Sequence, residues 1–187
     1  MEKTRISGRP FVFPMPTTLV GANVAGKPTF EAVAWCNMAA SNPPIIFISS
    51  NRRHYTNIGI KENKTFSVNI PTEELLRATD YCGLVSGHKV DKSGIFQTFY
   101  GETRTAPMIQ ECAVNMECEL YQLVELPRND IFFGKIVAAY AEDKYLTEGA
   151  PDLRKFKPII YSWSDDYWKL GAHLAKAFAV GKDYKPT

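Results

Sequence analysis

Alternating hydrophobic and polar positions run through much of the chain and predict β-strands. Three β segments are expected within residues 12–50, with turn signals at 26–28 and 41–44. Residues 64–71 alternate in the same way, which predicts one buried and one polar strand face. The amino-terminal part of the chain therefore reads as a succession of antiparallel strands.

Two long apolar segments follow Pro107. Residues 110–126 and 130–142 predict a pair of strands, and the polar stretch 127–130 predicts the hairpin turn between them. Residues 157–163 give a further strand candidate. Even spacing is expected to place four residues on one packed strand face: Cys112, Val114, Met116 and Cys118.

Helical signals are few and short. Residues 58–63 predict a short amphipathic helix, and Thr72 is expected to cap a second helix over residues 72–82. Residues 83–106 read as loop, and the tail from Asp165 is predicted to be helical. This balance predicts an all-β to α+β fold, a barrel of antiparallel strands with short flanking helices.

Composition narrows the class of protein. The 187 residues, 45% hydrophobic and 22% charged, predict one globular domain over residues 1–187. A formal charge of +2 is too close to balance for a nucleic-acid-binding surface, so no nucleic-acid partner is expected. Because no apolar run approaches about 18 residues and the start lacks a signal-peptide pattern, we expect no membrane association and a cytoplasmic location.

Several familiar sequence motifs do not occur in this chain. The four cysteines form no CxxC pair and the three histidines are far apart, so no metal site is expected and buried free thiols are the preferred interpretation. The sequence contains no GxG of a dinucleotide-binding or kinase glycine loop, no P-loop pattern GxxxxGK[ST] and no zinc-protease pattern HExxH. Residues 83–87 resemble a nucleophile elbow but place the serine one position late, which disfavours a serine hydrolase.

The segment 49–56 is the most informative, because a strand leads directly into a helix start. Free backbone N–H groups and the helix dipole favour a phosphate there, and Arg52, Arg53 and nearby hydroxyls can add hydrogen bonds. The alternative is a solvated basic turn in which Thr56 is an ordinary N-cap.

Two weaker signals accompany it. Residues 86–92 place a small residue, a glycine and two lysines in one loop, although most such runs are exposed turns. Residues 31–44 mix small and large side chains, which permits close approach to a strand edge, and Trp35 can lie beside a flat ring. On pattern alone, Trp35 as a core residue is the preferred alternative.

Together these segments resemble the flavin reductase-like proteins with an FMN-binding split barrel, most of all the flavoredoxin group. The resemblance covers most of the chain, and its specific part is the long central run. Its pieces are MPTTLV, GKP, AVAWCNMAASNPPIIFIS, RRHYTNIGIKENKTFSVNIPTEELLRATDYCGLVSGHKVDK, APMIQECAVNMECEL, and KPIIYS followed by LG.

The resemblance implies a six-stranded antiparallel barrel, a homodimer and an FMN near the subunit interface. Segments 49–56 and 86–92 are then expected to hold the FMN phosphate, and strand 33–37 to border the isoalloxazine ring through its backbone N–H groups. The implied cofactor-binding residues are Val33, Ala34, Trp35, Cys36, Asn37, Ser49, Ser50, Asn51, Arg52, Thr56, Ser86, Gly87 and Lys92.

The chain departs from the family pattern at several places. Thr29 and Ala32 stand where asparagine and threonine are common, and SGIF follows DK where an aromatic residue usually follows directly. The tail AHLAKAFAVGKDYK replaces a glycine-rich ending. Contacts to the ring and access to it are expected to differ accordingly. Three residues are candidate ring neighbours: Tyr161, Tyr167 and Trp168.

The leading functional hypothesis is an NAD(P)H-dependent flavin reductase in which NADH or NADPH reduces FMN at N5. The FMN carries the redox step, so no catalytic side chain is assigned. A flavoredoxin-like electron carrier that exchanges electrons with a partner protein is the first alternative. A non-redox protein that binds another phosphorylated ligand or haem is the second.

Overall fold

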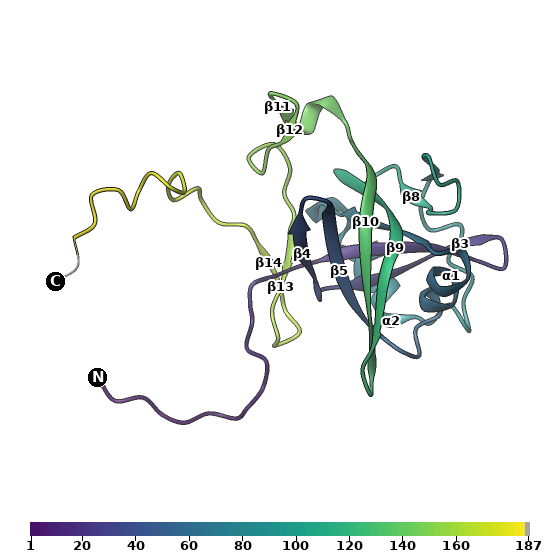
Figure 1. The fold of residues 1–187 in the computed structure, drawn as a ribbon, viewed down its shortest axis with the longest axis horizontal. Helices are drawn as coiled ribbons and strands as arrows, with labels where there is room; N and C mark the ends of the chain where they lie inside the picture. The colour runs from purple at the N-terminus through teal and green to yellow at the C-terminus, as the bar shows by residue number, and fades with distance from the viewer. Residues whose placement is uncertain (186–187) are drawn as a thin grey trace.

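The structure, a computed structural model, describes residues 1–185 and is built around one large antiparallel sheet (Figure 1). Seven strands pair in the order β3-β2-β6-β9-β10-β5-β4. Their bounds are β2 Thr18–Val24, β3 Lys27–Val33, β4 Cys36–Ser41, β5 Pro44–Asn51, β6 Thr65–Ile70, β9 Val114–Glu125 and β10 Asn129–Ala141. The predicted antiparallel class is confirmed, and the strand count is seven where six were expected.

The two edge strands of this sheet, β3 and β4, are consecutive in the chain. Only Ala34 and Trp35 separate the end of one edge strand from the start of the other. The Trp35 carbonyl accepts the Ser49 N–H at 2.8 Å, which joins this link to β5. Because so short a link must draw the two edges together, the sheet curls into a barrel-like shape.

Two short helical elements follow β5 and β6. Helix α1 spans Thr56–Asn63, and α2 spans Leu76–Leu84 after a 3-10 turn, η1, over Glu73–Leu75. Both helices were predicted, but the expected side-chain cap from Thr72 is wrong. The Glu73 N–H is satisfied instead by the Lys157 carbonyl at 2.9 Å, so it needs no hydroxyl from Thr72.

Smaller strands complete the fold around the large sheet. Strands β1, β13 and β14 form a separate three-stranded sheet, and two two-stranded sheets pair β7 with β8 and β11 with β12. The bounds are β1 Met15–Pro16, β7 Thr98–Phe99, β8 Met108–Ile109, β11 Leu146–Thr147, β12 Ala150–Pro151, β13 Ile159–Tyr161 and β14 Tyr167–Lys169, with the 3-10 turn η2 at Asp143–Tyr145.

The helical tail predicted from Asp165 is wrong. Strand β14 comes first, and residues 170–185 contain turns but no helix. Leu174 and Phe178 are almost fully exposed and Val180 is 74% exposed, so no apolar face is buried to stabilise a helix. The amino-terminal residues are exposed as well, and both ends run away from the body as extended arms (Figure 1).

The interior divides into two hydrophobic clusters. The larger is built on β-strand side chains such as Phe66 and Phe132, and the smaller joins Phe30 to Cys82 of α2 and to Cys112. All four cysteines are buried and free, as predicted. Cys112 lies before β9 and belongs to the second cluster, so the expected face shared with Cys118 is wrong.

In the part of the chain that the structure describes, no helix combines the length and apolar character needed to cross a membrane.

Candidate functional site

Two cavities adjoin at the junction of β3, the start of α1 and the end of α2. The smaller has a volume of about 140 Å³ and the larger about 890 Å³. Both are lined by a common set: Ala32, His54, Gly83 and Leu84. The smaller cavity adds Glu31, Tyr55, Thr56, Cys82, Val85, Ser86, Gly87 and Lys92. Together they form a site with a narrow polar end and a wide end.

The start of α1 forms one wall of the smaller cavity. The N–H groups of Tyr55 and Thr56 donate to no other backbone group within residues 1–185. The N-cap position is Tyr55, and no side chain caps the helix, so Thr56 is not an ordinary N-cap. The unpaired donors of a helix start thus face a cavity, as the anion-site interpretation requires.

The loop 86–92 forms the opposite wall and packs directly on this helix start. A side chain at Gly87 would place its Cβ 2.4 Å from the Tyr55 ring, so only glycine fits here. The rings of Tyr55 and His88 meet edge to face at 4.9 Å. The structure therefore brings together the two segments that the family resemblance assigns to one phosphate site.

Lys92 brings a cation into this cavity. Its side chain is 4% exposed, and its Nζ donates to the carbonyls of Phe30 at 2.9 Å and Cys82 at 2.8 Å. An ammonium has three N–H donors, so one remains for the cavity. Burial lowers the pKa of Lys92, because desolvation disfavours the charged form.

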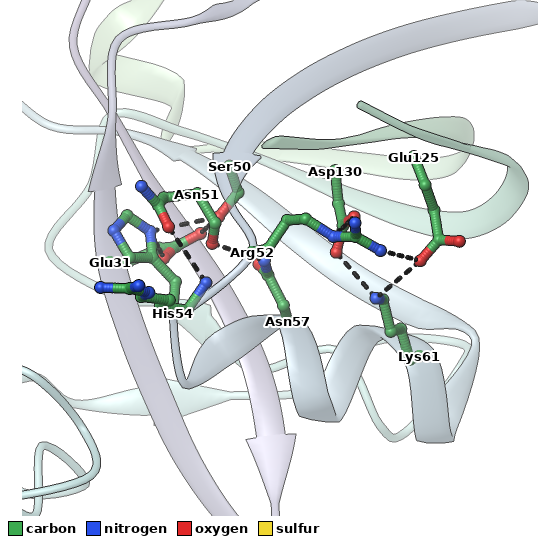
Figure 2. A network of polar contacts seen from close by, with 10 residues as sticks. Glu31, Ser50, Asn51, Arg52, His54, Asn57, Lys61, Glu125 and Asp130 are labelled. Atoms are coloured by element: carbon green, nitrogen blue, oxygen red, sulfur yellow. Dashed lines mark hydrogen bonds and ion pairs between the residues drawn. The ribbon is translucent and has the colours of Figure 1, made fainter. Parts of the chain in front are cut away.

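A second polar cluster lies beside Lys92 and was missed from the sequence. Glu31 of β3 is 5% exposed, its Oε1 accepts a hydrogen bond from Ser50 Oγ at 2.9 Å, and its Oε2 lies 2.5 Å from His54 Nδ1, close enough for an ion pair (Figure 2). The hydrogen bond to Glu31 raises the pKa of His54 against the opposing effect of burial. The only sequence signal was a lone carboxylate within the apolar strand FEAVAW.

Arg52 points away from both cavities. Its guanidinium contacts the buried Asp130 at 3.1 Å and Glu125 at 2.6 Å, and Lys61 of α1 contacts Asp130 at 2.7 Å (Figure 2). The Arg52 N–H also donates to the Arg128 carbonyl. The β9–β10 hairpin therefore holds Arg52 outside the site, and its predicted contact with phosphate stays a prediction.

The wide end of the site is lined by the link between the sheet edges. Val33, Ala34 and Trp35 line the larger cavity, as do three residues at the end of β5: Ser49, Ser50 and Asn51. Cys36 is buried in the core and Asn37 is exposed, and neither lines the cavity. Trp35 is 39% exposed, so the core interpretation of this residue is wrong.

Aromatic side chains from the β13–β14 hairpin face this link across the cavity. Trp163 stacks on Trp35 with ring centroids 6.0 Å apart and planes 11° from parallel. Tyr161 and Tyr167 line the same cavity, whereas Trp168 does not. The wide end thus offers flat apolar surface beside strand backbone, which suits a planar ring system.

Residues 8–162 match the flavin reductase like domain. The chain belongs to this family. Among solved structures, the flavoredoxin from Methanosarcina acetivorans is 47% identical to this flavin reductase-like chain, with a TM-score of 0.95 over 97% of this chain and 98% of that one. Flavoredoxin of Desulfovibrio vulgaris (Miyazaki F) is 32% identical, with a TM-score of 0.89 over 97% of this chain and all of that one.

A curated relative with a stated activity also matches this flavin reductase-like chain. The FMN reductase (NADH) RutF of Acinetobacter baylyi is 28% identical over 120 residues, which cover 62% of this chain and 60% of the relative. The family therefore includes proteins described as flavoredoxins and as a reductase.

Proposed function

We propose that this chain binds FMN, with the phosphate in the smaller cavity and the isoalloxazine ring in the larger. The single observation that carries the proposal is the convergence of Lys92, loop 86–92 and the open start of α1 on one cavity. A buried cation beside unpaired N–H donors suits a dianionic head group. Four predicted residues line this end: Thr56, Ser86, Gly87 and Lys92.

The larger cavity supports the same assignment. Its volume of about 890 Å³ falls in the usual range of small-molecule sites, which is roughly 300–1,000 Å³. Ala34 and Trp35 donate their N–H groups to no other backbone group in the described chain. These two donors are therefore free for the polar edge of a flavin ring.

Bound FMN supplies two-electron redox chemistry, and the protein binds, orients and tunes it. We propose an NAD(P)H-dependent flavin reductase, in keeping with the family and with the RutF relative. A flavoredoxin-like electron carrier is the second candidate, favoured by the 47% identity to the Methanosarcina protein. The proposal gives no side chain a covalent role.

We propose further that the protein is a homodimer. The arms leave large apolar side chains exposed, among them Phe13, Leu174 and Phe178. An apolar cavity of about 830 Å³ lies between the amino-terminal arm and the β13–β14 hairpin. A second copy is the partner that the resemblance implies, and covering these arms would remove their apolar surface from water.

Titration of the purified protein with FMN tests the proposal. Quenching of flavin fluorescence reports binding, and anaerobic addition of NADH or NADPH reports reduction through bleaching of the flavin absorbance. Binding with bleaching supports the reductase, and binding without bleaching supports the carrier. Failure to bind FMN at all would refute both candidates.

A matched pair of variants tests the phosphate end. Lys92→Met removes the buried cation, whereas Lys89→Met removes an exposed cation from the same loop. A charge-assisted hydrogen bond contributes about 1.5–3 kcal/mol, so Lys92→Met is expected to weaken FMN binding about 10- to 100-fold. Lys89→Met should leave the affinity unchanged. Circular dichroism checks that both variants are folded.

A further inference from the structure

Glu31, Ser50 and His54 form a closed polar triangle at the junction of the two cavities (Figure 2). Ser50 and His54 each contact Glu31, and Ser50 Oγ lies 3.1 Å from His54 Nδ1. The Nδ1 side of the imidazole is therefore fully engaged. Within residues 1–185 the Nε2 atom has no hydrogen-bond partner, and the His54 side chain is 46% exposed.

We propose that His54, held as an imidazolium by Glu31, donates its Nε2–H to the ligand's phosphate and makes the site selective for a phosphorylated flavin below a limiting pH. This inference rests on the proposed function. It adds a ligand that neither the sequence pattern nor the family resemblance nominated, and it gives Glu31 the part of a positioning residue.

The charges around the site explain why His54 is needed there. Glu31 is a buried carboxylate that lines the same small cavity as the proposed phosphate. Two anions in one poorly solvated cavity repel each other. Lys92 offsets part of this repulsion, but two of its donors are committed to carbonyls. A protonated His54 between Glu31 and the phosphate screens one anion from the other.

Other charged groups face His54 from the elements packed around it. Lys92 of the loop after α2 lines the smaller cavity with His54, and Asp80 of α2 lines the larger one. Arg128 of the β9–β10 hairpin lies across the larger cavity, together with Arg9 and Asp165. Around the larger cavity the two cations Arg9 and Arg128 match the two anions Asp80 and Asp165 in number. Glu31 and Lys92 therefore remain the dominant partners of His54, in agreement with the causes of its pKa shift.

The pH dependence follows from two titrations. The phosphate monoester becomes a dianion above a pKa of about 6. The pKa of His54 is raised from its usual value of 6.5, chiefly by the hydrogen bond to Glu31, so the imidazolium persists above that pH. FMN affinity is therefore expected to peak between the two values and to fall as the pH rises through the pKa of His54. Riboflavin lacks the phosphate, so its affinity should not follow this profile.

The test measures dissociation constants of FMN and riboflavin by fluorescence quenching from pH 5.5 to 9. His54→Gln keeps an N–H donor but leaves the Glu31 carboxylate unscreened. It is expected to lower the preference for FMN over riboflavin about 10-fold or more at neutral pH and to abolish the fall at high pH. The double variant E31Q/H54Q removes the unscreened carboxylate and should recover part of the lost preference. His173→Gln, in the exposed tail, is the control.

A purely structural role of the triangle predicts a different pattern. The double variant would then bind FMN no better than His54→Gln, and the riboflavin affinity would fall in parallel. Either result would overturn the inference while leaving FMN binding by the wild-type protein intact. Failure of the wild-type protein to bind FMN would instead refute the proposed function, and the inference with it.

Nuclear magnetic resonance of the wild-type protein keeps the inference falsifiable even if the variants fail to fold. Binding of an anion at Nε2 must raise the pKa of His54, because linkage between proton and ligand is reciprocal. FMN should therefore shift the imidazole titration of His54 to higher pH, and riboflavin should not. An unchanged titration on saturation with FMN would refute the contact.

Discussion

Replacing Asp130 by asparagine is expected to destabilise the fold without touching the cavities. The Asp130 carboxylate is completely buried, yet it contacts Lys61 Nζ at 2.7 Å and Arg52 Nε at 3.1 Å. Asparagine keeps the shape but removes the charge. The substitution leaves Lys61 of α1 and Arg52 of the β5–α1 turn without their shared negative charge.

The magnitude follows from the burial of the three groups. Breaking a buried ion pair by removing one partner typically costs about 3–5 kcal/mol. Because Arg52 and Lys61 are 41% and 37% exposed and can regain water, we expect a loss of only about 2–3 kcal/mol. For a chain of this length that corresponds to a decrease in Tm of about 5–10 °C.

Urea denaturation followed by circular dichroism, at a fixed protein concentration, measures this loss. The control is Asp91→Asn, because Asp91 contacts Lys27 at a similar 2.8 Å but both side chains are exposed. We expect no measurable change for this control. If the two variants lose the same stability, burial of Asp130 does not matter and the reasoning is refuted.

Arg52→Ala connects this ion-pair network to the site. The resemblance predicts weaker FMN retention, since Arg52 was nominated as a phosphate ligand. The structure places its guanidinium against Asp130 and Glu125, so we expect a loss of stability with FMN affinity unchanged. A tenfold loss of FMN affinity with intact stability would show instead that Arg52 leaves Asp130 for the ligand.

Three further predictions concern the site and the core. Gly87→Ala forces a Cβ into the Tyr55 ring and should weaken FMN binding and lower stability by about 1–3 kcal/mol, whereas Gly94→Ala, with open space around it, should do neither. Because His54 has a raised pKa in the folded state, its stabilising effect is complete below pH 6.5 and is lost as the pH rises through that raised value. Urea unfolding across this window should show the decline, and Glu31→Gln should flatten it. Burial raises the pKa of all four cysteine thiols, so a thiol reagent should react with them only after unfolding, and rapid reaction of the native protein would contradict the burial.

Much of the fold was predictable because strands and turns follow from the local pattern of hydrophobic and polar residues. The alternation in residues 64–71 and the polar break at 127–130 correspond to β6 and to the β9–β10 hairpin. The helical tail was predicted wrongly because a helix-like pattern stabilises a helix only where one face is buried, and every residue from 170 to 185 is exposed. The cap at Thr72 failed for a similar reason, since a distant carbonyl took its place.

The site shows the same division between local and distant information. Local sequence was enough to nominate the start of α1 and the loop 86–92, since a strand that runs into a helix leaves donors free and the loop combines a small residue, one glycine and two lysines. Only the folded chain decided that Gly87 meets Tyr55, that Lys92 is buried beneath the cavity, and that Glu31 pairs with His54 while Arg52 turns to Asp130. Those contacts join residues that are far apart in the chain. The curled sheet brings these residues together, and no local sequence pattern predicts that arrangement.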